Sequence, residues 1–184
     1  MFKVIPKDTF DNLQIETGVL LSTFDPSAVK VPEDADIICA TTGGITATCT
    51  PKYTNIAEDV DNAPDNVKEF LVLDGWDCGM SFTSLRTAAE SIRLYLGAAD
   101  VVGNKITPRG AVKNEDFRDI WWVGDRADGG CVAIKMKNAL STGGFSLKTE
   151  KKGKGQISVT LTGYISVKNQ DEVPMEFYSI DKQV

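Results

Sequence analysis

The chain has 184 residues, of which 42% are hydrophobic and 25% charged. A chain of this size and composition can bury a core of its own, so we expect one domain over residues 1–184. Twenty Lys and Arg against 26 Asp and Glu give a net charge of −6, which disfavours binding to nucleic-acid phosphates. The absence of histidine excludes Ser-His-Asp and Cys-His catalysis and zinc sites that need His.

The sequence shows no targeting or membrane signal. Its apolar runs are only a few residues long, whereas a membrane-spanning helix needs about 20. The first eight residues lack the apolar core of a secretory signal, so we expect synthesis in the cytoplasm and no membrane partner. The four cysteines contain no C-x-x-C pair and predict neither a structural zinc site nor a disulfide scaffold.

The first third of the chain predicts strands. Residues 13–23 indicate one strand, and residues 36–50 indicate a hairpin that turns at Gly43 and Gly44. Gly-Gly is typical of such turns because glycine accepts positive φ.

The loop length of this hairpin decides which residues face Cys39. A turn centred on Gly44 places Cys39 opposite Cys49 on one face, whereas a change of one residue places it opposite Thr48. A disulfide between Cys39 and Cys49 is therefore geometrically possible, although a reducing compartment disfavours it.

Residues 51–66 form the longest stretch without periodicity. Four acidic residues against Lys52 give it a net charge of −3, and it has few apolar residues. Loops of this length in compact domains are usually functional or disordered. We expect a loop that becomes ordered against another surface, through its isolated apolar residues Tyr53, Ile56 and Val60.

A strand and then a helix follow this loop. The apolar residues Trp76, Cys78, Met80 and Phe82 alternate with small or polar ones, which predicts a strand with one wet face. The next segment predicts a helix at about 87–96, packed on the sheet.

Three features support this helix. Thr87 and Glu90 fit a capping box, and Gly97 fits the end of a helix. The apolar stripe consists of Leu85, Ala89, Ile92 and Leu96.

Residues 115–168 predict an antiparallel meander. Val132, Ile134 and Met136 alternate with Ala133, Lys135 and Lys137, and a longer alternation runs over 157–167 with a bulge expected at Gly163. Between these two strands, four lysines outweigh Glu150 for a local charge of +3. Such a cluster is usually a solvated hairpin tip. Its members are Lys148, Lys151, Lys152 and Lys154.

No catalytic or cofactor motif is present. The glycine pattern at 153–158 lacks a third glycine and joins two strands, which indicates a hairpin turn rather than a dinucleotide site. Asp59, Asp61 and Asp65 lack the glycine that a calcium loop needs. We therefore expect no cofactor and no metal.

For two other groups of residues, a structural role is a better interpretation than a catalytic or sugar-binding one. The adjacent Trp121 and Trp122 face opposite sides of a strand, so one is expected in the core and the other in the core or at a subunit contact, rather than on a sugar platform. Acidic pairs that could serve a glycosidase lie beside turns, where Asp is common for backbone reasons. These pairs are Asp116 with Asp119 and Asp125 with Asp128.

Nearly the whole sequence resembles the major tail tube proteins of long, non-contractile-tailed bacteriophages that infect Gram-positive hosts. The stretches that carry the resemblance are LLSTFDPS at 20–27, DIICATTGGITATCTPKY at 36–53, EDVDNAPDNVKE at 58–69, LDGWDC at 73–78, AAESIRLYLGAAD at 88–100, and DIWWVGDRADGGCVAIKMKNALSTGGFSLKTEKKGKGQISVTLTG at 119–163. None of these strings performs chemistry, so the resemblance implies a structural protein and no enzyme.

The resemblance implies a mainly β fold, an antiparallel β-sandwich or barrel with one flanking helix. It also implies stacked hexameric rings that form a virion tail tube for DNA passage, assembled in the host cytoplasm. The loop at 51–66 is expected to reach a neighbouring subunit. Further partners would be the tape measure, tail terminator and distal tail proteins, with DNA only as transiting cargo.

Two main alternatives and one weaker one remain at this stage. One is a carbohydrate-binding β-sandwich such as a phage adhesion module, and the other is the inner tube of a contractile tail or a phage-derived bacteriocin. A glycoside hydrolase is the weakest interpretation. For self-assembly the candidate residues are Tyr53, Ile56, Glu58, Asp59, Val60, Asp61, Lys148, Lys151, Lys152 and Lys154.

Overall fold

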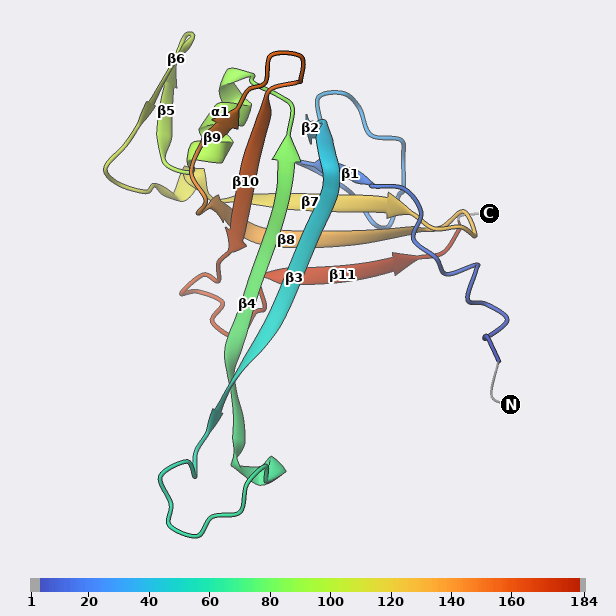
Figure 1. Cartoon of the computed structure of the whole chain (residues 1–184), viewed down its shortest axis with the longest axis vertical. Helices are drawn as coiled ribbons and strands as arrows, with labels where there is room; N and C mark the ends of the chain where they lie inside the picture. The colour runs from blue at the N-terminus through green and yellow to red at the C-terminus, as the bar shows by residue number, and fades with distance from the viewer. Residues whose placement is uncertain (1–3, 183–184) are drawn as a thin grey trace.

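The computed structural model describes residues 4–182 and is mainly β (Figure 1). Its strands are β1 (Val19–Leu21), β2 (Ile37–Cys39), β3 (Thr41–Asn55), β4 (Leu71–Ser84), β5 (Ala99–Val102), β6 (Lys105–Pro108), β7 (Arg118–Asp125), β8 (Cys131–Ser141), β9 (Ser146–Lys148), β10 (Gln156–Gly163) and β11 (Met175–Ile180). The helix α1 spans Ala89–Leu96, and short 3-10 turns cover Lys68–Phe70 and Asn114–Asp116.

Nine of these strands form a large antiparallel sheet that folds over into two layers, and β5 and β6 pair separately as a two-stranded sheet. Within residues 4–182 the pairing order is β2-β1-β7-β8-β10-β4-β3, with β11 beside β8 and β9 beside β10. Strand β10 meets β8 only at the three pairs from Leu161 to Gly163, so the sheet changes layer there. In Figure 1, β3, β4 and β10 run along the long axis, and β7, β8 and β11 cross them. The expected sandwich with one flanking helix is confirmed.

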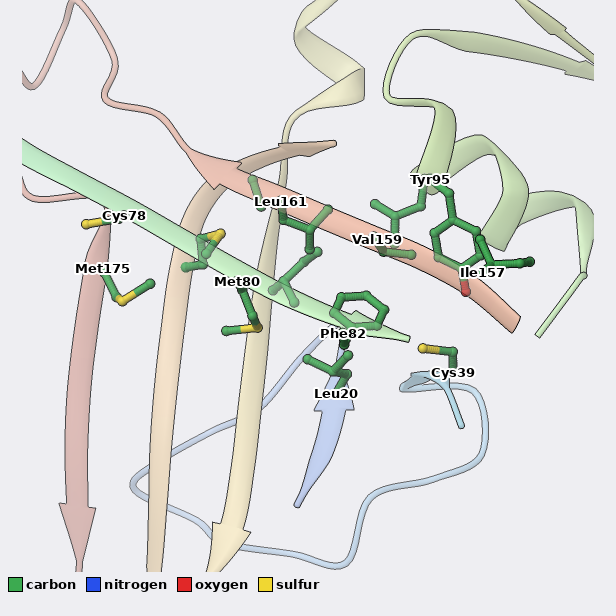
Figure 2. Packing of buried hydrophobic residues seen from close by; sticks show 14 residues of the cluster. Leu20, Cys39, Cys78, Met80, Phe82, Tyr95, Ile157, Val159, Leu161 and Met175 are labelled. Carbon is green, nitrogen blue, oxygen red and sulfur yellow. The ribbon is translucent and has the colours of Figure 1, made fainter. Parts of the chain in front are cut away.

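The main core lies between these two layers (Figure 2). Strands β4 and β10 contribute alternate side chains, and β1, β7, β8 and β11 contribute the opposing ones. The buried members are Leu20, Cys39, Cys78, Met80, Phe82, Leu94, Tyr95, Ile120, Met136, Ala139, Ile157, Val159, Leu161 and Met175. Alternation along β4 therefore follows the period predicted for Trp76 to Phe82.

The two adjacent tryptophans lie on opposite faces of β7, as expected. Trp121 is buried in a second, smaller cluster with Leu21 and Ala133. Trp122 packs against the main core, and its indole N–H donates to the carbonyl oxygen of Thr17 at 3.0 Å. Neither ring forms an exposed platform for a sugar.

The meander β7-β8-β10 is confirmed, but Gly163 does not form a bulge. Strand β10 ends at this residue. A Cβ at Gly163 would lie 3.1 Å from the carbonyl oxygen of Pro174 and 3.2 Å from Met136. The glycine therefore allows a close approach of two chain segments where the strand stops.

The hairpin predicted over 36–50 is wrong. Strand β3 continues through Gly43 and Gly44, which have φ values of 79° and 83°. The pairing of β3 with β4 shifts between Thr42 and Ile45, so these glycines form a bulge. Positive φ serves bulges as well as turns, which is why the dipeptide alone did not distinguish the two.

Neither partner considered for Cys39 in this hairpin, Cys49 or Thr48, lies opposite it. Cys39 belongs to β2 and lies opposite Leu20. Cys49 lies opposite Cys78 instead.

Helix α1 is confirmed, but its cap and its buried face differ from the prediction. Ala88 is the N-cap residue and makes no side-chain cap bond, so Thr87 and Glu90 form no capping box. The buried face consists of Ser91, Leu94 and Tyr95, whereas Ala89, Ile92 and Leu96 are half-buried.

Two hydrogen bonds fix this orientation of the helix. The Tyr95 hydroxyl lies 2.6 Å from Ser84 Oγ, and the Ser141 hydroxyl donates to the Tyr95 carbonyl at 2.6 Å. Gly97 ends the helix with a φ of 76°, as predicted. Among residues 4–182, no helix has the length and apolarity needed to cross a membrane.

Candidate assembly surface

The hairpin of β3 and β4 is longer than the core that supports it. Its strands pair from Thr41 opposite Ser84 to Asn55 opposite Leu71, with register shifts between Thr42 and Ile45 and between Lys52 and Tyr53. The inner half lies over the core, and the outer half projects from the body at one end of the long axis (Figure 1). We call residues 52–75 the arm.

The arm corrects the loop predicted at 51–66. The first residues of the predicted loop, Pro51 to Asn55, continue β3, and only the following segment to Asn66 is irregular. Pro51 lies opposite Trp76 in the outermost strand of the sheet, where a missing backbone N–H is tolerated.

Large apolar side chains of the arm are exposed. Leu71, Leu73 and Val72 alternate between the two faces of β4, so both faces of the arm are apolar. The exposed fractions are 54% for Tyr53, 60% for Ile56, 57% for Val60, 52% for Leu71, 44% for Val72 and 47% for Leu73. A concentration of exposed large apolar side chains on one projecting segment is typical of an interaction site.

The tip of the arm is held by turns of the backbone. The amide of Ile56 donates to Phe70 at 2.9 Å, and that of Ala63 donates to Val60 at 3.1 Å. The acidic side chains of the tip are exposed, and none takes part in an ion pair within residues 4–182. These side chains are Glu58, Asp59, Asp61 and Asp65.

The predicted lysine cluster lies at the tip of the β9–β10 hairpin. Lys148 pairs with Gln156 across the hairpin, and its ammonium group lies 2.9 Å from Glu150. The other three lysines are exposed in the turn and have no ion pair in the described part of the chain. They are Lys151, Lys152 and Lys154.

The structure therefore gathers the candidate residues into two groups. Tyr53 to Asp61 lie on the arm, and the four lysines lie on the β9–β10 tip. The two groups lie at opposite ends of the long axis (Figure 1), so they cannot neutralise one another within one chain.

Sequence reasoning missed the second strand of the arm. Leu71, Val72 and Leu73 lie in the apolar run that begins at Phe70, and this run was the available signal. A continuous apolar run is typical of a strand covered on both faces. It also missed Phe177 of β11, which is 61% exposed on a strand that pairs on one side only within residues 4–182.

A groove of about 550 Å³ lies between the base of the arm and residues 162–174. Trp76 and Tyr164 line it, and their side chains are 37% and 39% exposed. Its other apolar lining residues are Leu73, Ile165, Val173 and Pro174, and its acidic ones are Asp74, Asp77, Asp171 and Glu172.

Three of the four acidic residues considered for a glycosidase have structural contacts. Asp116 is buried and accepts a bond from Arg109 at 2.5 Å, and Asp119 lies 2.9 Å from the ammonium group of Lys135. Asp128 bonds Arg126 and the amide of Gly130, and the Arg126 bond lowers the pKa of Asp128 to about 2. The described residues contain no group of three or more His, Cys, Asp or Glu placed to hold a metal.

Of the comparisons with families, curated sequences and solved structures, the last gives matches. No family model matches the chain, and no curated protein sequence matches it. Among solved structures, the chain is similar to a component of a structure described as "Virion of native gene transfer agent (GTA) particle". The match has 9% sequence identity and a TM-score of 0.45, and it covers 88% of this chain and 95% of the other. The match is a similarity of the backbone fold, and by itself it assigns neither an activity nor a partner to this chain.

Proposed function

We propose that this chain is a non-catalytic virion structural protein that assembles with copies of itself into a phage tail tube. In this proposal, hexameric rings stack along one axis and enclose the path of the DNA. The observation that carries self-assembly is the projecting arm, because its large apolar side chains remain 44–60% exposed within residues 4–182. The ring number and the tail tube itself rest on the sequence resemblance.

The arm supports assembly because exposure of its apolar side chains to water is unfavourable. An isolated two-stranded hairpin is marginally stable, and six large apolar side chains on this one are 44–60% exposed. A neighbouring subunit that covered both faces of the arm would bury these side chains. Their burial would stabilise the contact by about 25 cal/mol per Å² of apolar surface.

Charge supports stacking in a fixed direction. The acidic tip of the arm and the lysine tip lie at opposite ends of the molecule (Figure 1), so translation along the long axis brings opposite charges together. A contact between two different surfaces of identical subunits is heterologous, and when it does not close it builds a filament. Complementary charge mainly speeds and orients such a contact.

Open sheet edges support contacts within a ring. Strands β3 and β2 end the pairing order of the described sheet, and each pairs on one side only. Pairing of such edges between subunits would remove unpaired backbone groups that otherwise favour aggregation.

Electron microscopy of the concentrated, purified protein tests this proposal. We expect rings or tubes of uniform width with a central channel. A monodisperse monomer at high concentration, in low and in high salt, would contradict it.

An assembled tail would bring the tape measure, tail terminator and distal tail proteins as further partners, and it would form in the host cytoplasm. Whether the tail is contractile or non-contractile follows from the presence of a sheath on native particles.

The groove beside Trp76 favours a carbohydrate-binding module as the second candidate. Exposed aromatic rings that line a groove are suited to stacking on sugars. A monomer that binds glycans, with binding lost in Trp76→Ala, would support this candidate, whereas tubes that bind no glycan would support the tail tube.

A further inference from the structure

Two of the four cysteines face each other at the base of the arm. Cys49 of β3 and Cys78 of β4 are directly opposite in the antiparallel register, and their sulfur atoms are 3.1 Å apart. All four cysteines are free thiols. Cys39 and Cys131 are buried elsewhere, in β2 and at the start of β8.

The backbone at this position suits a cross-strand bond. Directly opposite residues of antiparallel strands have Cα atoms about 4.5 to 5.5 Å apart. Disulfides span Cα separations of about 4.4 to 6.8 Å. The sulfur atoms are 3.1 Å apart, and a disulfide holds them at about 2.0 Å, so only a small displacement is needed to join them.

The two thiols differ in access to solvent. Cys49 is half-buried, whereas Cys78 is only 2% exposed. Burial, reinforced by the neighbouring Cys49 thiol, raises the pKa of Cys78. A reagent in solution therefore meets Cys49 first, and Cys78 reacts from within the protein.

We propose that Cys49 and Cys78 form a reversible disulfide that fixes the base of the arm when the protein meets a small-molecule disulfide. The Cys49 thiolate attacks one sulfur of the reagent and releases one reagent thiolate, which leaves a mixed disulfide on Cys49. Cys78 loses its proton and attacks the Cys49 sulfur, which releases the second reagent thiolate. Two protein thiols are oxidised, one reagent disulfide is reduced, and the two protons go to the released thiolates.

The position of this bond gives it a structural consequence. Outward from it come the pairs Thr50 with Asp77 and Pro51 with Trp76, and then the register shift beside Tyr53. A slip of one residue would turn every arm side chain to the other face. The bond holds the register at the last position supported by the core, and it fixes the pairs between this position and the shift at Lys52 and Tyr53.

Oxidised glutathione added to the reduced, purified protein tests this inference. We expect two of the four thiols to resist alkylation under denaturing conditions, with a reversible rise in Tm of about 5 to 10 °C. Trypsin should release residues 31–52 linked to residues 69–86. Because peptide 31–52 contains both Cys39 and Cys49, the Cys39→Ser variant serves as the matched control and should keep the link, whereas Cys49→Ser should lose it.

The thiol count of the wild-type protein decides the result even if a variant folds poorly. Four free thiols after oxidation, a stable glutathione adduct on Cys49, or a link through Cys39 or Cys131 would each overturn the inference. The experiment detects the disulfide itself rather than assembly, so its result is independent of the tube proposal.

Discussion

The two halves of the β3–β4 hairpin use the same strands in opposite ways. In the inner half, Cys78, Met80 and Phe82 point into the core, and the residues between them are small or polar. In the outer half, Leu71 to Leu73 are consecutive apolar residues, and all three are exposed. The inner half thus has the pattern of a strand covered on one face, and the outer half has that of a strand covered on both.

Under the proposed function, this difference separates the part of the hairpin that stabilises the single chain from the part that serves assembly. The inner half is covered by β1, β7, β8 and β11 of the same chain. The apolar side chains of the outer half remain 44–60% exposed within residues 4–182, and the proposed function accounts for this pattern through a neighbouring copy.

Matched alanine variants on the two halves should differ most. Met80→Ala removes a side chain that is 1% exposed, and we expect it to destabilise the folded chain by about 2 to 5 kcal/mol. Leu73→Ala, which is 47% exposed, should change the free energy of unfolding by less than about 0.5 kcal/mol. Urea unfolding of the monomer measures both. Equal losses would contradict the division of the hairpin.

The helix offers a second matched pair. Leu94→Ala should cost about 2 to 3 kcal/mol, because this side chain is buried against the sheet, whereas Ile92→Ala should cost about 1 kcal/mol. The midpoints of thermal unfolding compare them. A larger loss for Ile92→Ala would mean that α1 packs through the face first expected from the sequence.

A charged residue on the arm should stop assembly without unfolding the chain. Leu73→Asp places a carboxylate in the surface that a neighbour would cover, and burying an unpaired charge is strongly unfavourable. We expect loss of high-mass species in sedimentation, with an unchanged unfolding midpoint. The control is Val102→Asp, at an exposed position on the separate β5–β6 hairpin. Loss of assembly in both variants would remove the specific role of the arm.

Charge reversal at the lysine tip should have the smallest effect. Each exposed ion pair contributes about 0 to 1 kcal/mol, so Lys151→Glu with Lys152→Glu should slow assembly while leaving the monomer folded. Asp59→Lys with Asp61→Lys in the same chain should partly restore the rate, and salt should weaken the wild-type contact. Light scattering follows the rate. Unchanged assembly of the lysine variant in low salt would exclude the charge contact.

Sequence patterns predicted the parts of this fold that depend on local periodicity. The alternation from Trp76 to Phe82 and the meander depend on a two-residue period, which is visible in the residues themselves. The bulge at Gly43 and Gly44 was missed because it depends on the partner strand. The buried face of α1 was missed because Tyr95 is oriented by Ser84, which lies outside the helix.

The candidate assembly surface was predicted in part. Its charged tips were visible as clusters in the sequence. The arm was not, because Pro51 and the acidic residues resembled a loop, and because exposure of Leu71 to Leu73 is a property of the folded chain.

Hydrogen exchange of the arm in monomeric and assembled protein tests the central claim most directly. The amides of residues 52–75 should exchange fast in the monomer, where only one hairpin partner protects them, and slowly in the assembled state. The inner strand residues 78–84 should be slow in both and serve as the internal reference. Equal exchange of the arm in the two states would contradict the claim that a second copy covers it.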